Sequence, residues 1–544
     1  MSSSQRLTTR QADAQDRRTR MTQRRQQLSH KIRKQKKSEY LARKRNLPYN
    51  ANKILAVSDP VATMASVLQI YCENPTAESL RVLQATLQST NLVGSEENPL
   101  VFLSQENQSK AVSLLENLRK HSASTDDLQI ILQILVRLTA ISYTQSSSYY
   151  GCLPSSWCSL LAQDSQWLSI LVSLVPREET LIIIGNLVGE GSSQVCPALR
   201  AAGMIPALVS AINQPAAAWA LTNAIRNDTA TWASVYCNEK FLNPGLLEQL
   251  LQQPLIATQT AWMIASLTSR EAAVVQYLVG HPSFSQTLVR CLEQPISQNQ
   301  TVPLVQALGN IATYEEFVAR LLSLPSFLPL LGQLLFQNHT NSGSREVMVH
   351  TAWLAGCLLC DAGLSNHPST TSAAPSLMPI LFQLLGDNPE TLSLEVKREI
   401  VCALRNALAL PPAASADPSV STVPVPLPWK DQVRGSLSSI VKLISSFDSD
   451  AVLAALYVVD LLLRRDQSLQ TALEEEDIEA ALESVCDSAL EEANEIAANL
   501  LDDFFYNDDE EEEYPPMGLV EATPTRSGMG RGRGATLPSW MTQN

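Results

Sequence analysis

The chain has 544 residues and a formal net charge of −14, and only 6% of its residues are aromatic. A single hydrophobic core usually stops growing near ~250–300 residues, so this length requires several domains or a solenoid that grows by stacking. No apolar run reaches the ~18–20 residues that a membrane span needs, and the N-terminus has no apolar signal-peptide core. We therefore expect a protein that is neither secreted nor membrane-spanning.

The first 50 residues form a basic arm. They hold 15 Lys and Arg against 3 Asp and Glu, whereas the rest of the chain holds 25 basic and 51 acidic residues. Residues 13–46 contain no Pro or Gly and Pro48 follows, which predicts one helix ending near Asn46. Composition alone favours a solvated or nucleic-acid-binding helix. Joined to an acidic body, the arm also suits an intramolecular contact or an acidic protein partner.

Residues 51–505 are expected to form an all-α, right-handed superhelical solenoid of the armadillo/HEAT type. Apolar stretches of 10–15 residues, spaced at i, i+3, i+4 and i+7, alternate with short Pro/Gly/Ser/Asn breaks. Alignment of the stretches reveals a repeat with a mean step of about 44 residues, within the ~40–47 typical of armadillo and HEAT units. The repeating position is occupied in turn by Thr139, Asn186, Asn223, Ser266, Asn310, Cys357 and Asn406. Such units stack into a solenoid with a long concave surface.

Two segments toward the C-terminus interrupt this pattern. A Pro-rich insert at about 411–430 is predicted to loop out between units. Residues 506–544 are acidic and then Gly/Arg-rich, and we expect them to be disordered.

The chain offers little that suggests enzyme, metal or cofactor chemistry. Its ten cysteines are mostly single, and Cys357-Leu-Leu-Cys360 is interpreted as a buried helical thiol pair in a reducing compartment. There is no phosphate-binding Gly-x4-Gly-Lys-Ser/Thr, no His-Glu-x-x-His and no Gly-x-Ser-x-Gly. We expect a protein that is not an enzyme and needs no metal or cofactor.

A recurring Trp–Asn pair indicates a binding surface. Four residues before the repeating positions stand Leu135, Ile182, Trp219, Trp262, Gln306, Trp353 and Cys402. Residues i and i+4 share one face of a helix, so Trp219 and Asn223 should project together. Successive Trp rings would hold Lys or Arg stems by cation–π attraction of ~0.5–2 kcal/mol, while each Asn amide clamps the backbone of an extended peptide. A single Trp is more often core, but recurrence at one repeat phase beside Asn favours binding.

These segments resemble the importin-α family, adaptors that read basic nuclear localisation signals. The likeness rests on Trp219-Ala-Leu-Thr-Asn223, Gly185-Asn186-Leu-Val-Gly-Glu190, Ala307-Leu-Gly309-Asn310 and Lys397-Arg-Glu399-Ile-Val-Cys402-Ala-Leu-Arg-Asn406. It extends to the arm, which is similar to the importin-β-binding arm of the family, and covers most of residues 13–513.

The resemblance implies a set of contact residues. The residues implied to bind cargo are Asn186, Glu190, Trp219, Asn223, Trp262, Asn310, Trp353, Glu399 and Asn406. Those implied to bind importin-β are Arg17, Arg18, Arg20, Leu28, Lys31, Arg33, Lys34, Lys36 and Lys37. Arg43, Lys44 and Arg45 resemble a localisation signal that folds back onto the groove in self-inhibition. The acidic helix from Ile478 to Phe505 resembles the last repeat of the family and its export-receptor contact.

The sequence therefore predicts a nuclear-import adaptor that moves between cytoplasm and nucleus, with neither membrane nor nucleic acid as its partner. We call the seven pairs, from Leu135 with Thr139 to Cys402 with Asn406, the ladder. Only three of the seven pairs keep Trp, and the first has lost both Trp and Asn. This loss leaves open a non-transport scaffold or a dedicated chaperone for one protein partner. A third and weaker hypothesis is an RNA-associated protein that uses the arm and the Arg-Gly tail.

Overall fold

The computed structural model describes twelve parts of the chain. They are residues 60–89, 108–122, 124–140, 157–190, 194–228, 233–340, 345–360, 368–387, 390–409, 429–486, 488 and 490–506. Every regular element in these ranges is a helix, so the all-α prediction is confirmed. The basic arm, most of the Pro-rich insert and all but the first residue of the predicted tail lie outside them.

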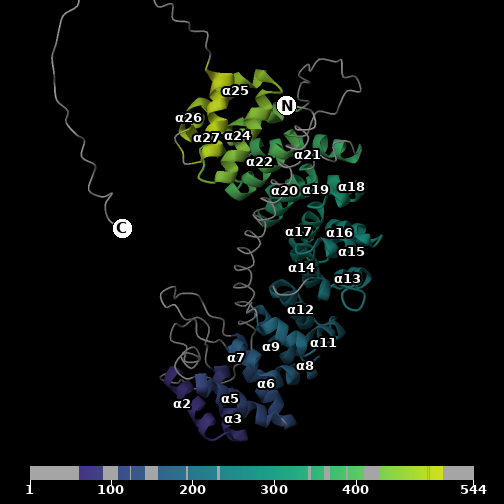
Figure 1. Ribbon diagram of the computed structural model, residues 1–544, viewed down its shortest axis with the longest axis vertical. Coiled ribbons are helices and arrows are strands. Elements are labelled where there is room, and N and C mark those ends of the chain that lie inside the picture. Colours follow the sequence, from purple (N-terminus) through teal and green to yellow (C-terminus); the bar gives the residue numbers. More distant parts are fainter. Residues whose placement is uncertain are drawn as a thin grey trace, which may run out of the picture.

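One row of helices, each packed on the next, runs through the whole solenoid. These inner helices are α3 (Ala77–Ser89), α6 (Thr125–Ala140), α9 (Glu178–Gly189), α12 (Pro215–Asn227), α14 (Ala257–Thr268), α17 (Thr301–Ala312), α20 (Arg345–Leu359), α22 (Leu394–Leu408), α24 (Ser449–Leu463) and α27 (Glu491–Leu500). In Figure 1 the stack is curved, and the inner helices follow its concave side. The superhelical repeat expected from the sequence is therefore confirmed.

The remaining helices cover the outer side of the stack. They include α2 (Pro60–Glu73), α5 (Gln108–His121), α8 (Ser165–Ser173), α11 (Met204–Ser210), α13 (Pro244–Leu251), α16 (Phe284–Glu293), α19 (Phe327–Thr340), α21 (Pro368–Asp387), α23 (Lys430–Ile444) and α26 (Ile478–Cys486). Short helices complete the units: α7 (Trp157–Gln163), α10 (Val195–Ala201), α15 (Ala272–Gly280), α18 (Glu315–Leu322), α25 (Gln470–Glu474) and the 3-10 turns η1 (Ala233–Val235), η2 (Gln298–Gln300) and η4 (Gln467–Leu469).

Local sequence explains where the helices of one unit begin. Gly203 has φ of +92°, a left-handed conformation that favours glycine, and it turns the chain from α10 into α11. Pro215 occupies the first turn of α12, where its missing N–H costs nothing. Asn243 caps α13 by accepting a hydrogen bond from the Leu246 N–H at 2.9 Å. Local sequence thus sets where α11, α12 and α13 begin.

Small residues let the inner helices approach closely at the centre of the solenoid. Ala217, Ala218, Ala220 and Ala224 of α12 are fully buried, and this helix packs on both α9 and α14. Alanine adds little volume and loses no side-chain entropy, so the helix backbones can lie near one another. Leucine and isoleucine from the outer helices fill the remaining space.

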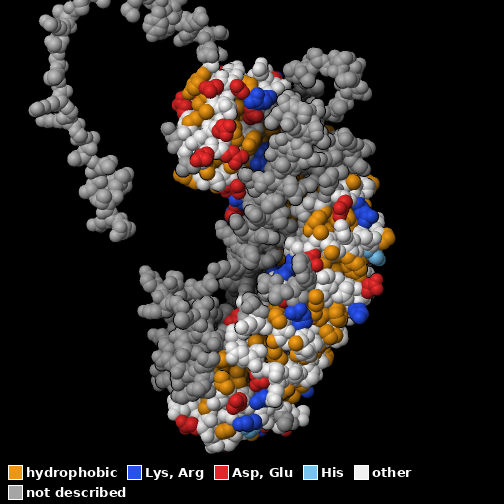
Figure 2. Space-filling model, viewed as in Figure 1, with side chains coloured by type: hydrophobic (Ala, Val, Ile, Leu, Met, Phe, Trp, Pro, Cys, Tyr) orange, Lys and Arg blue, Asp and Glu red, His pale blue; other side chains and the backbone are white. Residues whose placement is uncertain are grey.

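The C-terminal end of the solenoid is acidic, and its helical prediction needs a correction. Figure 2 shows Asp and Glu side chains gathered over α24, α26 and α27. The single helix expected from Ile478 to Phe505 is instead α26, α27 and a π-helical turn at Leu501–Phe505. Ser488 lies in the break, where its carbonyl accepts from the Asn494 amide at 2.9 Å. Such short-range bonds compete with helix continuation.

Cys360 also departs from its prediction. Cys357 is buried inside α20, whereas Cys360 lies just beyond the end of that helix and is half-buried. The prediction of a buried pair within one helix is therefore half right.

No single described helix is long and apolar enough to cross a membrane. One pair of consecutive helices, Glu316–Leu322 and Phe327–Gln337, is long and apolar enough when the two are taken together, but they are bent by 81°.

Candidate functional site

All seven ladder positions fall on successive inner helices. Thr139 lies on α6, Asn186 on α9 and Asn223 on α12, and the later positions follow on α14, α17, α20 and α22. Because each of these helices packs on the next, residues one repeat apart in sequence become neighbours. The structure therefore brings the predicted cargo-binding residues into one row.

The ladder asparagines join each inner helix to the one before it. The Asn223 amide nitrogen donates to the Gly185 carbonyl at 3.1 Å, and the Asn310 amide nitrogen donates to the Ala265 carbonyl at 2.8 Å. The Asn406 amide nitrogen makes the equivalent bond to the Gly356 carbonyl at 3.0 Å. The three acceptors stand one residue before Asn186, Ser266 and Cys357, which occupy the equivalent position one repeat earlier. A carbonyl can only accept, so the contact fixes the orientation of the amide and turns its oxygen the other way.

The first ladder asparagine uses a hydroxyl instead. The Asn186 amide nitrogen donates to the Thr139 hydroxyl at 3.1 Å, and that hydroxyl donates to the Leu135 carbonyl at 2.8 Å. Thr139 is buried, so this repeat keeps the link between helices without presenting an amide.

Two tryptophan rings lie across glycines of the preceding helix. A Cβ atom placed on Gly185 would stand 2.0 Å from Cζ3 of Trp219, and one on Gly309 would stand 1.7 Å from Cζ3 of Trp353. No side chain fits beneath either ring, so glycine is required at both positions. Trp219 is 8% exposed and Trp353 is 6% exposed. The ring and the Asn223 amide both meet Gly185, as the i, i+4 spacing predicts.

The third tryptophan, Trp262, already contacts a cationic side chain of the same protein. The guanidinium carbon of Arg226 lies 5.6 Å from the centre of the Trp262 ring, within the ~6 Å reach of a cation–π contact. Arg270 donates to the Asp228 carbonyl at 2.7 Å and also to the Arg226 carbonyl, which fixes the end of α12 beside Trp262. Burial lowers the pKa of Arg270 below its usual value, although Asp228 opposes the shift.

The ladder positions without tryptophan are occupied by packed side chains. Leu135 is fully buried, Ile182 is half-buried, and Gln306 and Cys402 are 4% and 5% exposed. Gly356 precedes Cys402 by one repeat. A Cβ atom placed on Gly356 would make only ordinary contacts, 3.5 Å from Ala403. The Trp-on-Gly arrangement is thus absent where cysteine replaces tryptophan.

The two predicted acidic contacts have different environments. Glu190 is exposed at the end of α9 and forms no ion pair with any described residue. Glu399 is 6% exposed and lies 3.3 Å from Arg398, whose guanidinium also contacts Asp448 at 2.8 Å. Only Glu190 therefore presents an ion-pair-free carboxylate.

The predicted contacts of the arm are not described. Arg17, Arg18, Arg20, Leu28, Lys31, Arg33, Lys34, Lys36 and Lys37, with Arg43, Lys44 and Arg45, lie outside the described residues. Their roles stay predictions.

Sequence reasoning missed Gly185, Gly309 and Arg226 as parts of this surface. The signal for the glycines is the Gly-Asn pair at 185–186 and 309–310, where each glycine lies one repeat before a tryptophan. Arg226 lies three residues after Asn223 and thus one helical turn along the same face.

Other polar clusters do not form an alternative site on this row. No group of three or more metal-ligating side chains is found among the described residues. Ser283, His281 and Glu248 lie together, but the serine hydroxyl points at Glu248, 2.9 and 3.0 Å from its two oxygens. The same Nδ1 atom of His281 faces Glu248 at 3.1 Å and the serine at 3.2 Å. A nucleophile–base relay needs opposite ring nitrogens for these two contacts.

Comparison with known proteins agrees with the repeat fold. No protein-family model and no curated protein matches the sequence. An engineered protein solved by a structural genomics consortium superposes with a TM-score of 0.58 at 16% identity, over 81% of this chain and 98% of its own. A designed armadillo repeat protein in complex with the peptide (KR)4 is 22% identical over 48% of this chain and 98% of its own, with a TM-score of 0.37. At such identities the likeness concerns the fold alone. The chain has an armadillo-type repeat fold.

Proposed function

We propose that the protein is an adaptor for nuclear import that binds basic localisation signals in the groove formed by the inner helices. The observation that carries the proposal is the rigid pair Trp219 and Asn223, both held on Gly185 of the preceding helix. A ring that is already immobilised loses little entropy when a lysine or arginine stem packs on it. The basic arm, the resemblance to importin-α and the acidic body support the same function.

The groove has two ends that suit a basic segment and a middle that does not. Trp219 with Asn223 forms one end, and Trp353 with Asn406 belongs to the other, where Glu399 is already paired with Arg398. Between them, Trp262 already faces the Arg226 guanidinium, which disfavours a second cation there. We therefore expect signals with two basic clusters to bind better than signals with one.

Calorimetry with a synthetic two-cluster basic peptide tests the groove. Replacing Trp219 and Asn223 together with Ala should weaken binding about 10- to 100-fold, because a cation–π contact and a hydrogen bond disappear together. Gln276→Ala on the outer helix α15 is the matched control and should bind as the wild type does. Equal affinity of all three proteins would place the peptide elsewhere.

We also propose that the arm binds importin-β and that the acidic C-terminal helices contact an export receptor, so that the protein cycles between cytoplasm and nucleus. A pull-down with importin-β should succeed for the full chain and fail for the chain lacking residues 1–50. The first described helix begins at Pro60, so the deletion removes none of the described helices. Retention of importin-β by the shortened chain would contradict the role of the arm.

The second candidate is a scaffold or chaperone dedicated to one protein partner. Four of the seven ladder positions lack tryptophan, and Arg226 occupies the face of a fifth position. A groove with so few open aromatic surfaces is as well suited to one specific partner protein as it is to a range of basic signals. Absence of calorimetric binding to basic peptides, even after removal of residues 1–50, would favour this function.

A further inference from the structure

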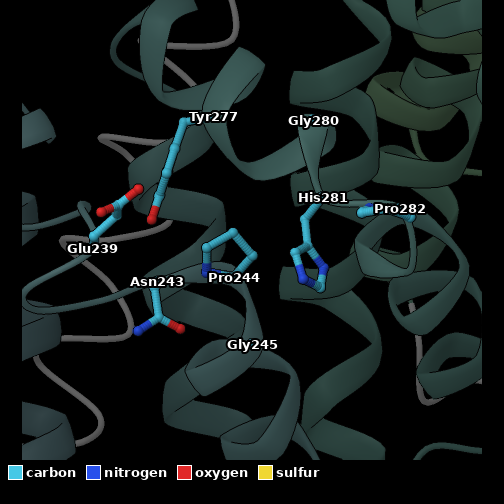
Figure 3. A pocket seen from close by; sticks show the side chains of 8 residues that line it. All are labelled: Glu239, Asn243, Pro244, Gly245, Tyr277, Gly280, His281 and Pro282. Carbon is cyan, nitrogen blue, oxygen red and sulfur yellow. The ribbon is translucent and has the colours of Figure 1, made fainter.

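A cleft on the outer side of the solenoid carries a second group of unused polar side chains. It lies between the start of α13 and the end of α15, and its lining includes Glu239, Asn243, Pro244, Tyr277 and His281 (Figure 3). Both helices belong to the outer side, and the inner helix α14 follows α13 and precedes α15 in the chain. The cleft is therefore separate from the groove that carries the Trp–Asn ladder.

The rim of the cleft has polar groups without partners among the described residues. Glu239 is exposed and forms no ion pair there, even with the adjacent Lys240. The Tyr277 hydroxyl makes no hydrogen bond to the described part of the chain. The Asn243 oxygen accepts the capping bond from the Leu246 N–H, which leaves the amide nitrogen unused. Figure 3 shows Glu239, Tyr277 and Asn243 together on one side of Pro244, so their unused polar groups border the same part of the cleft.

His281 presents an acceptor to this cleft. Its Nδ1 atom lies 3.1 Å from Oε1 of Glu248, and the Ser283 hydroxyl lies within hydrogen-bond distance of both oxygens of that carboxylate. The carboxylate can only accept, so in the neutral ring the proton resides on Nδ1. The Nε2 lone pair is then left as an acceptor, and it has no partner among the described residues.

The cleft is electronegative as well as rich in acceptors. Glu239 contributes an unpaired carboxylate, and α15 directs its C-terminal end, which carries partial negative charge, toward Gly280 in the lining. The pKa of Tyr277 is raised, first by desolvation and then by Cys237 and Glu239. Because burial keeps the Cys237 thiol protonated, Glu239 is the only one of these causes that places a negative charge near the phenol at neutral pH.

We propose that this cleft binds the guanidinium group of an arginine side chain from a partner protein. The planar group packs over the Tyr277 ring beside Pro244 and donates hydrogen bonds to Glu239, while His281 lies on the other side of Pro244 and reports the occupancy of the cleft (Figure 3). Arginine fits better than lysine because its flat, many-donor head can stack on Tyr277 and donate more than one hydrogen bond to the Glu239 carboxylate at once. A phosphate group would be repelled by Glu239. A proline-rich segment would pack on Tyr277 and Pro244 but leave every polar group on the rim unsatisfied.

Histidine-selective ¹³C labelling of the full chain gives a direct test. The chain has 6 His, so the ring signals are few, and His281→Gln identifies the one that matters. The probe is the blocked pentapeptide acetyl-Gly-Gly-Arg-Gly-Gly-amide, and its matched control carries uncharged citrulline in place of arginine. We expect a saturable shift of the His281 signal with the arginine peptide and none with the citrulline peptide.

Variants distinguish this cleft from the groove. Glu239→Gln, an exposed and nearly isosteric change, should weaken the interaction about fivefold through loss of one charge pair. The chain with Trp219→Ala and Asn223→Ala should show the same His281 shift as the wild type, even if the proposed groove function is wrong. No shift with the arginine peptide would overturn the proposal, as would an equal shift in Glu239→Gln or a shift that disappears in the groove variant. A shift produced by a tetraproline peptide but not by the arginine peptide would overturn it too.

Discussion

The glycines beneath the tryptophan rings show how one atom can set the packing between two inner helices. Alanine normally stabilises a helix by about 0.5–1 kcal/mol relative to glycine, because it loses less backbone entropy. At Gly185 the added Cβ atom would stand 2.0 Å from the Trp219 ring, and at Gly356 it would meet only ordinary contacts at 3.5 Å. Two glycines at the same repeat phase should therefore respond in opposite directions.

We expect Gly185→Ala to destabilise the protein and Gly356→Ala to stabilise it. Overpacking of this kind costs about 1–3 kcal/mol, which exceeds the gain in helix propensity. The first variant should also alter the fluorescence of Trp219 and weaken peptide binding, while the second should do neither. Thermal unfolding followed by fluorescence measures both effects. A rise in Tm for Gly185→Ala would show that Trp219 can leave its position without cost.

The buried thiols provide a second prediction at the scale of single residues. Burial, the largest cause, raises the pKa of Cys196 to about 12 and that of Cys237 to about 12. A raised thiol pKa means less thiolate at a given pH, and the thiolate is the form that alkylating agents attack. Brief treatment of the native protein with iodoacetamide at pH 8 should leave both residues unmodified, as mass spectrometry can measure. The half-buried Cys360 is the comparison residue, and faster labelling of Cys196 than of Cys360 would contradict this interpretation.

At the scale of elements, the sequence predicted the helices well because each leaves a periodic apolar pattern. The 44-residue step and the Trp219–Asn223 spacing placed the ladder correctly on successive helices. The links between helices left no such pattern: Asn223 bonding to Gly185 and Arg226 reaching Trp262 join residues 38 and 36 positions apart. Such pairs depend on how repeats stack, and one sequence without a structure does not specify it. The break at Ser488 was missed because Ser and Asn tolerate both helix and turn.

Arg270 is the contact that we expect to matter most between two elements. Its guanidinium bonds to the last carbonyls of α12 from the end of α14, where it also lies near the buried Asp228. Arg270→Met keeps much of the aliphatic volume but removes every donor, and a buried carbonyl without a partner costs about 1–3 kcal/mol.

The measurable result should be faster hydrogen exchange in the last turn of α12, together with a lower Tm. Solenoid stability is a sum of repeats and interfaces, so the change should remain local to α12 and α14. Arg290→Met, at an exposed position on α16, is the matched control and should change neither quantity. Uniform destabilisation of all repeats by Arg270→Met would contradict a local role.

At the scale of the whole molecule, opposite charges occupy the two parts of the chain. Residues 1–50 have a net charge of +12, and the remainder has a net charge of −26. An arm attached to an acidic body by a short segment has a high effective concentration, on the order of mM, at any nearby site. Even a weak contact of Arg43, Lys44 and Arg45 with the groove would then compete with a basic signal.

We therefore predict that the arm inhibits cargo binding and that importin-β relieves the inhibition. Peptide affinity should rise when residues 1–50 are deleted and also when the full chain is saturated with importin-β, because both remove the competitor. The two binding events are then reciprocally coupled by about 1–3 kcal/mol, or roughly 5- to 150-fold in affinity. Replacing Arg43, Lys44 and Arg45 with Glu should raise peptide affinity as the deletion does, while importin-β should still bind through the contacts proposed earlier in the arm. Raising the salt concentration should reduce all of these differences, since exposed charges are screened within ~10 Å at 0.1 M. Equal peptide affinity for the full chain, the shortened chain and the importin-β complex would exclude self-inhibition.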